Sequence, residues 1–387
     1  MLLVNTCYTQ TNIDSLINIL HITPNLPIKE KIRLYMSVCD FYAATDNETM
    51  MKYAKEGLDL VNNGKDKYLE GVFYRALGGI YDVKAEFDTA LMYYNKVLKL
   101  GLEIKNDDLE GGAYRSFAFT YFRQGKYILA LEYCMKVLQF YEKIGNESGY
   151  TVALGNIGEL HQILGNTDRA IYYIEQAKSL AEKNKETYLQ AQCYNVLSII
   201  YSEKNKQEKA LHYGLKALEM SNACQSILYQ STSMQTLAKA YNLLNDYKKA
   251  IECADKSLEI AYKINDPTLI VSGLKIVSDI YRDKKNYDKS LAAAYKAWAI
   301  DSTNLNNIID LTFNITLANM YLGNEKEAEK YLYKNTEAYK QKTHKNFQQT
   351  LLEMEVKYET EKKELRIAAL EKEKKLTTWL IIVSAIV

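Results

Sequence analysis

The chain has 387 residues, with 49 basic and 48 acidic side chains and a formal net charge of +1. This near-neutral balance argues against a nucleic-acid-binding surface, which needs an excess of basic residues to neutralise phosphates. Hydrophobic residues make up 48% of the chain and prolines number only three, so we predict an all-α protein with a substantial core.

Residues 1–10, MLLVNTCYTQ, resemble the end of a signal peptide. An apolar run is followed by small and polar residues before Thr11, as in such leaders, but a basic segment ahead of the apolar run is missing. Two interpretations stay open for this segment: a signal-peptide remnant, or the frayed N-terminus of a soluble protein.

Residues 11–340 repeat with a period of 40. Six segments align without gaps, from YDVKAEFDTALMYY at Tyr81 to YRDKKNYDKSLAAA at Tyr281. Tyr42 precedes this series one position short of a full period, and Tyr321 continues it at the regular spacing. A fixed period of this length is the sequence signature of a repeat protein, and we predict about eight units.

Each unit carries a small residue three positions before the aromatic residue and another nine positions after it, as Gly78 and Ala90 do around Tyr81. A polar turn such as RQGKY lies between, so each unit is predicted to be a helix, a turn and a helix. Small residues let two antiparallel helices approach closely, and stacked hairpins bury the face that one hairpin leaves open. In the last unit Ala328 follows Tyr321 by only seven positions, which predicts a shorter turn.

This pattern resembles the tetratricopeptide repeat (TPR), including a second alanine late in the second helix, at Ala177, Ala217 and Ala297. The usual repeat of that family is about 34 residues long, so the resemblance implies a variant with longer helices. His161 stands where the other units have tyrosine. The resemblance implies an all-α solenoid that binds proteins or peptides and carries no catalytic residues.

The first helix of each unit is expected to line a ligand groove. By register, the side chains that point into it are Arg75, Arg115, Phe119, Phe122, Glu159, Asn195, Gln235, Lys239, Lys275, Asp279 and Arg282. They are mixed in charge, and the Lys/Asn/Arg clamp of chaperone adaptors in this family has no match at these positions. A peptide or protein ligand is therefore expected from the set, while any single residue is better explained as part of a solvated polar face.

No motif in the chain predicts a metal site, a cofactor or a catalytic centre. The six cysteines are Cys7, Cys39, Cys134, Cys193, Cys224 and Cys253, and none forms a CxxC pair. The four histidines are equally scattered, and the HExxH motif is absent. We interpret the cysteines as small buried side chains on helices, although the sequence leaves a disulfide framework open.

Residues 341–376 are expected to form one long charged helix. No glycine or proline occurs between His344 and Leu376, and acidic and basic residues alternate closely. Leu351, Tyr358 and Leu365 recur at intervals of seven, which is typical of a weak coiled-coil seam. A homodimer stem and a single solvated spacer helix are both consistent with this pattern.

Residues 377–387 are expected to be the first half of a transmembrane helix. The apolar run is shorter than the roughly 20 residues that span a bilayer. Lys374, Lys375 and Trp379 are residue types that anchor such a helix at the membrane interface. The alternative is an apolar tail that packs against the solenoid.

The order of these segments resembles a family of membrane sensors of Bacteroidetes-type bacteria, in which an extracytoplasmic TPR domain precedes one membrane helix and a cytoplasmic output module. The resemblance implies a periplasmic sensory module anchored in the membrane, with its output domain, a helix-turn-helix or a histidine kinase, missing from these residues. Two alternatives stay open: a membrane-anchored scaffold for an envelope complex, and a cytoplasmic peptide-responsive regulator.

Overall fold

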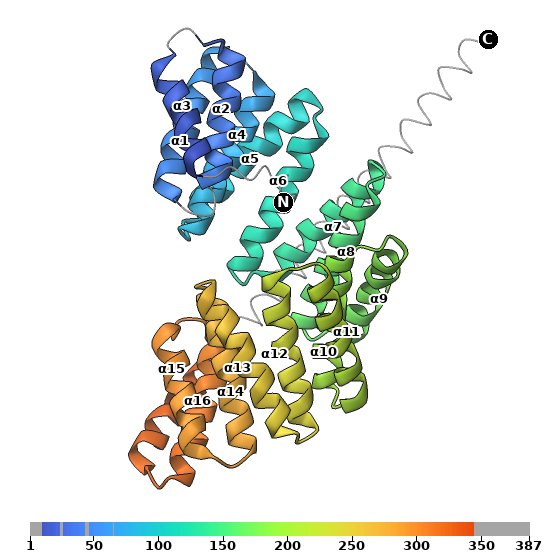
Figure 1. Ribbon diagram of the computed structural model, residues 1–387, viewed down its shortest axis with the longest axis vertical. Helices are drawn as coiled ribbons and strands as arrows, with labels where there is room; N and C mark the ends of the chain where they lie inside the picture. The colour runs from blue at the N-terminus through green and yellow to red at the C-terminus, as the bar shows by residue number, and fades with distance from the viewer. Residues whose placement is uncertain (1–9, 24–25, 43–45, 65, 344–387) are drawn as a thin grey trace, which may run out of the picture. The chain divides into compact units, whose positions relative to one another are not determined.

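The computed structural model describes residues 10–23, 26–42, 46–64 and 66–343, and every regular element in these ranges is an α-helix. The predicted all-α repeat fold is confirmed (Figure 1). Within the described ranges, no helix combines the length and the apolar character that crossing a membrane requires. The charged segment, the apolar end with Lys374, Lys375 and Trp379, and residues 1–9 lie outside the described residues.

The chain divides into two compact bodies, an N-terminal body of residues 1–196 and a C-terminal body of residues 197–387. The helices of the N-terminal body are α1 (Gln10–Ile22), α2 (Ile28–Tyr42), α3 (Asn47–Gly64), α4 (Lys67–Val83), α5 (Phe87–Ile104), α6 (Asp107–Arg123), α7 (Tyr127–Lys143), α8 (Glu147–Ile163) and α9 (Thr167–Lys183). Helix α10 (Thr187–Glu203) contains the boundary. The C-terminal body continues with α11 (Gln207–Ala223), α12 (Ile227–Leu243), α13 (Tyr247–Lys263), α14 (Pro267–Asp283), α15 (Tyr287–Ile300), α16 (Leu305–Tyr321) and a helical segment over residues 325–343.

From α2 onward the helices pair into hairpins, and we call the first helix of each hairpin its A helix and the second its B helix. Even-numbered helices are A helices, and each packs against the B helix that follows it; α10 meets α11 in the Tyr201–Tyr213 stack, and α16 meets the last B helix through the Asn335–Ile309 hydrogen bond. Within each body, neighbouring A helices also touch, as α4 touches α6 and α14 touches both α12 and α16. Residues 325–343 form the B helix of the last hairpin.

Each repeat consists of two equal halves, and each half is one helix and one turn. Helices α6 to α14 each have 17 residues. Short turns of equal length separate them, and one residue per turn has a positive φ, which is a common way to end a helix. These residues are Ala85, Lys105, Gly125, Gly145, Gly165, Lys185, Asn205, Gln225, Asn245, Asn265 and Lys285.

The predicted shortening of the last turn is wrong. The turn before the last B helix has its positive-φ residue at Gly323, and Asn324 N–H bonds to the carbonyl of Asn319 at 2.9 Å. The same bond joins Asn286 to Tyr281 in the preceding repeat at 2.8 Å. Asn319, which is buried, therefore takes the register position that the sequence analysis gave to Tyr321.

The two missing residues lie before α16 instead. Asp301 has an extended backbone where the other junctions between repeats have a left-handed residue. Its carboxylate accepts hydrogen bonds from the backbone N–H groups of Thr303 (2.9 Å) and Asn304 (3.2 Å). This compact Asx-type turn replaces the usual helix end, so α16 begins two residues early.

The aromatic residue of the A helix stacks on a tyrosine of the B helix twelve positions later in four repeats. The stacked pairs, with centroid separations of 5.4–5.6 Å, are Tyr81–Tyr93, Tyr121–Tyr133, His161–Tyr173 and Tyr201–Tyr213. His161 thus keeps the geometry of the tyrosine it replaces. Burial, with a smaller effect from Arg169, lowers the pKa of His161, so the neutral ring is favoured in the stack.

Three of the cysteines in the described residues, Cys39, Cys134 and Cys193, are buried on helices. Burial is the main cause that raises the pKa of both Cys134 and Cys193 to about 12. A thiol with such a pKa stays protonated and unreactive. The interpretation of the cysteines as small core residues therefore holds for these buried thiols.

Candidate functional site

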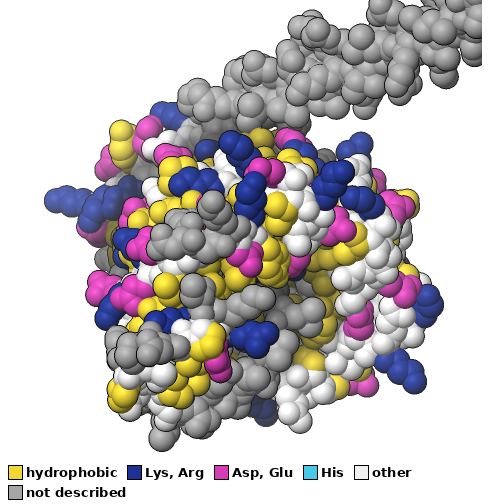
Figure 2. All heavy atoms as spheres, turned by 90° about the horizontal axis from the view of Figure 1, so that it is seen from above, with side chains coloured by type: hydrophobic (Ala, Val, Ile, Leu, Met, Phe, Trp, Pro, Cys, Tyr) yellow, Lys and Arg dark blue, Asp and Glu magenta, His cyan; other side chains and the backbone are white. Residues whose placement is uncertain are grey.

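The candidate site is the face of the A helices that the repeat register predicts to line a groove, and we call it the A face. It is described separately for each body. Figure 2 shows Lys, Arg, Asp and Glu side chains interspersed over the visible surface, without a large region of one charge. The A face has the same mixed character.

In the N-terminal body, the basic part of the A face is on α4 and α6. The Arg75 guanidinium lies 3.7 Å from the carboxylate of Asp108, which links the two helices. Arg115 is exposed, and Phe119 has 58% of its surface exposed on the same helix. An exposed aromatic ring beside an exposed cation is a surface suited to contact with another chain.

Glu159 of α8 is the acidic residue of this part of the A face. Its carboxylate lies 3.5 Å from the Gln192 amide nitrogen, and the same nitrogen lies 3.4 Å from the Asn156 amide oxygen. Burial raises the pKa of Glu159, and the Gln192 contact opposes that shift. Glu159 is therefore a half-buried carboxylate that contacts the next A helix.

Phe122 and Asn195 do not offer a free side chain at this face. The Phe122 ring meets Tyr127 edge-on, with 5.7 Å between centroids, and belongs to the core under α6 and α7. Asn195 is only 4% exposed. Both residues thus contribute to packing between helices.

In the C-terminal body, Gln235 of α12 is also buried and joins α12 to α14. Its amide nitrogen donates to the carbonyl of Leu269 at 3.1 Å, and its amide oxygen accepts from the Ser272 hydroxyl at 2.8 Å. Gln235 therefore fixes the spacing of the two helices, and its amide serves the packing of the array.

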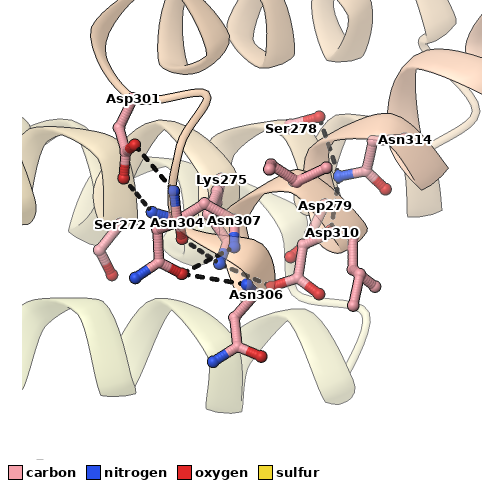
Figure 3. Close-up of polar contacts among 12 residues, drawn as sticks. Ser272, Lys275, Ser278, Asp279, Asp301, Asn304, Asn306, Asn307, Asp310 and Asn314 are labelled. Atoms are coloured by element: carbon pink, nitrogen blue, oxygen red, sulfur yellow. Dashed lines mark hydrogen bonds and ion pairs between the residues drawn. The ribbon is translucent and has the colours of Figure 1, made fainter. Parts of the chain in front are cut away.

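Lys275 of α14 is paired with α16 (Figure 3). Its ammonium lies 2.6 Å from the Asp310 carboxylate and donates to the Asn307 amide oxygen at 3.0 Å. Arg282, two helical turns further along α14, bonds to Asp279 (2.8 Å) and to the Asn314 amide oxygen (2.6 Å).

Asn314 holds this network to the core. Its amide nitrogen donates to Asp279 at 2.8 Å and to the buried hydroxyl of Ser278 at 3.1 Å (Figure 3). Burial raises the pKa of Asp279, while Arg282 and Asn314 act in the opposite direction. The cations of α14 are thus already satisfied by α14 and α16.

Lys239 of α12 differs from these cations. It makes no hydrogen bond or ion pair with any residue that the structure describes, and its side chain is exposed. Protein atoms around it nevertheless lower the pKa of the ammonium; Lys275 acts in the same direction, and Asp279, Asp310 and Glu203 act in the opposite one. The Lys239 ammonium therefore has hydrogen-bond donors that no described residue accepts, and it lies among protein atoms while remaining accessible to solvent.

The sequence analysis missed the partners on α16, namely Asn307, Asp310 and Asn314. Continuing the period of 40 past α14 assigns the wrong side chains to the A face of α16, because the helix is shifted by two positions. The signal for the shift was the sequence DSTN at 301–304: Asp301 forms the turn described above, and the Asn304 side chain caps α16 by accepting from the backbone N–H groups of Asn306 and Asn307.

Comparison with known proteins agrees with this architecture. Models of the tetratricopeptide repeat match residues 109–183, 149–223 and 231–263. A search of curated proteins found no matching sequence.

Solved structures with the same fold share little sequence with this chain. A Rap conjugation gene regulator of plasmid pLS20, in complex with the Phr* peptide, superposes with a TM-score of 0.61 at 13% identity, over 85% of this chain and 94% of that chain. A Rap protein complexed with competence and sporulation factor gives 0.55 at 16% identity, over 81% and 99%. The apo quorum sensor NprR from B. thuringiensis gives 0.56 at 16% identity, over 84% and 97%.

The matches to the repeat models, the 40-residue period of the sequence and the helical hairpins of the structure all indicate the same repeat architecture. The chain contains tetratricopeptide repeats.

Proposed function

We propose that this TPR array is a non-enzymatic module that binds a peptide or an extended protein segment along the A face of its C-terminal body. TPR hairpins supply a row of side chains at fixed spacing, and such a row can follow an extended ligand residue by residue. Most polar residues of the face, such as Gln235, Lys275 and Arg282, are held by their neighbours, which reduces the entropy lost when a ligand orders them.

Lys239 is the observation that carries this proposal. A crowded ammonium without a protein partner gains more from an incoming acceptor than a fully hydrated surface lysine does, since fewer waters must be displaced. A backbone carbonyl or a carboxylate of the ligand would satisfy it. Lys275 and Arg282 are already paired with other residues of the protein, so they would shape the site, and Lys239 would be the first cation to bond to the ligand.

The structural neighbours support a peptide ligand as the first class to test. Two of them are complexes, one with the Phr* peptide and one with competence and sporulation factor. They share only the fold with this chain, so the proposal itself rests on the A face. The neighbours guide only the choice of a peptide as the probe.

Lys239→Glu is expected to weaken peptide binding by about 10- to 100-fold, the range for a hydrogen bond to a charged group. The probe is a peptide selected on the full-length protein from a random-sequence library, and affinity is measured by calorimetry. Lys248→Glu, an exposed lysine of the B helix α13, is the matched control and should bind as the parent does. Equal affinity of the two variants for every selected peptide would remove Lys239 from the site.

We further propose that the array is the sensory part of a membrane-anchored regulator, on the strength of the charged and apolar segments at 341–376 and 377–387. The full-length protein should then sediment with membranes of its native host and be released only by detergent. Recovery in the soluble fraction would contradict the anchor and favour the peptide-responsive soluble regulator. If the protein is instead an envelope scaffold without signalling, it should still sediment with membranes but bind none of the selected peptides.

A further inference from the structure

The A face of the C-terminal body changes from polar to apolar at α16. Three apolar side chains, spaced so that they share one face of this helix, lie there: Phe313, Leu317 and Met320. Phe313 is 50% exposed and Met320 is 61% exposed, while Leu317 is half-buried. Once the shift of α16 is taken into account, the same positions on α12 and α14 carry only polar or charged side chains: Gln235, Lys239, Asn242, Lys275, Asp279 and Arg282. Apolar side chains grouped on an exposed face indicate a surface that contacts another molecule, whereas single ones occur on any protein.

Arg282 of α14 supports the first of these apolar side chains. Its guanidinium carbon lies 5.8 Å from the centre of the Phe313 ring, within the range of a cation–π contact. Arg282 is itself bonded to Asp279 and to the Asn314 amide, so its position is fixed. The Phe313 ring is therefore held by α14, and its exposed half is accessible to a ligand.

The charges on the A face of α14, which packs between α12 and α16, are compensated within the protein. Lys275 lies 2.6 Å from the Asp310 carboxylate (Figure 3), and Arg282 lies 2.8 Å from that of Asp279. A charged ligand group placed over α14 would lose water without gaining an unpaired charge of opposite sign, which costs free energy. A ligand segment that crosses α14 is therefore expected to be uncharged.

Taking the peptide-binding function proposed above as its basis, we infer that the ligand is an extended peptide with an acidic group at Lys239, a large apolar side chain on Phe313 and uncharged residues between them. Lys239 provides the charge complementarity, because no described residue accepts a hydrogen bond from its ammonium. A carboxylate there satisfies a cation that the protein leaves without a partner. The apolar side chain covers the exposed half of the Phe313 ring.

The separation of the two contacts sets the length of the linking segment. Packed helices have axes about 8–10 Å apart, so α12 and α16, which both touch α14, are about 16–20 Å apart. An extended peptide advances about 3.3 Å per residue. The acidic and the apolar residue of the ligand should therefore lie about five or six positions apart.

A peptide library screened on three forms of the full-length protein tests this ligand class. The probe is a library of random peptides about twelve residues long, enough to span both contacts. The three proteins are the parent, Phe313→Ala and the matched control Tyr333→Ala, which removes an aromatic side chain that is 68% exposed on the last B helix.

Peptides enriched on the parent and on Tyr333→Ala should carry Asp or Glu and, about five or six positions away, an aromatic or large aliphatic residue. On Phe313→Ala the preference for the acidic residue should remain, and the preference for the apolar residue should disappear. Phe313 is half-exposed, so its substitution leaves the buried core intact.

Calorimetry with the tightest peptide makes the test quantitative. Replacing its apolar residue by alanine should weaken binding to the parent and to Tyr333→Ala by about 10-fold or more, because a large side chain is no longer buried. For Phe313→Ala the same replacement should change the affinity by less than about 3-fold, since its contact is already absent.

Two results would overturn the inference and leave the proposed function standing. Enriched peptides that depend on Lys239 but show no apolar preference would remove Phe313 from the site, and another part of the chain or a second copy would then cover α16. Equal losses of affinity for the parent and for Phe313→Ala would mean that the apolar residue binds elsewhere. If no peptide is enriched on any of the three proteins, the proposed function fails, and the inference fails with it.

Discussion

Replacement of Phe117 by alanine is expected to lower the free energy of unfolding by about 3–5 kcal/mol, the range for a large aromatic residue in a core. Phe117 is 1% exposed and lies among three rings. Its centroid is 4.8 Å from that of Tyr133, 6.0 Å from Tyr94 and 6.4 Å from Tyr121. These rings come from α5, α6 and α7, so one side chain holds two repeats together.

Phe119→Ala is the matched control, because Phe119 is on the same helix and mostly exposed. We expect it to change stability by less than about 0.5 kcal/mol, as a surface substitution does. Repeat arrays unfold by parts, so the measurement is hydrogen exchange resolved by peptide. Protection should fall in α5 to α7 for Phe117→Ala, and equal protection in both variants would contradict the central role of this ring.

The sequence was sufficient to predict the hairpins and their period, because both depend on local features. A small residue, an aromatic residue and a polar turn recur at fixed positions, and each turn between α4 and α15 contains one left-handed residue. The failure at the last repeat has a local cause too. The turn at Asp301 is built differently, so a period extrapolated from Tyr281 reached Tyr321 where the structure uses Asn319.

The candidate site was less predictable, because register gives the direction of a side chain and says nothing of its partner. Lys239 and Lys275 lie on the same predicted face of successive A helices, one helical turn apart in register, and the sequence does not distinguish their surroundings. The structure separates them, since Lys275 is paired with Asp310 and Lys239 has no such neighbour among the described residues. Charge reversal at Lys275 would therefore break an ion pair within the protein, which makes Lys239 the cleaner test of binding.

The sequence also did not show that the two side chains that meet across each hairpin have complementary sizes. The small residue of the A helix faces a B-helix residue sixteen positions later, and the two sizes compensate. Gly78 faces Tyr94 and Gly158 faces Ile174, whereas Ala238 packs in one core cluster with Ala254. A small residue alone predicted close helices, but the identity of its partner needed the structure.

Gly158→Ala is therefore expected to destabilise the protein by about 1–3 kcal/mol, although alanine is the better helix former. A methyl group there would lie 2.5 Å from Ile174 Cγ1 and 3.2 Å from the Ile174 backbone nitrogen. Ile174→Ala alone should cost about 2–5 kcal/mol through the cavity it leaves. The double variant reproduces the alanine pair of residues 238 and 254. Its loss of stability should therefore be smaller, by at least about 1 kcal/mol, than the sum of the losses in the two single variants.

Gly155→Ala on the same helix separates the effect of the contact from that of helix propensity. A methyl group at Gly155 would meet the Gln192 side chain at 3.8 Å, an ordinary contact, so the substitution should stabilise the helix by about 0.5–1 kcal/mol. Hydrogen exchange resolved by peptide, read in α8 and α9, measures all four variants. Additive losses at residues 158 and 174, within about 0.5 kcal/mol, would mean that the two sites relax independently and that paired sizes do not hold the hairpin together.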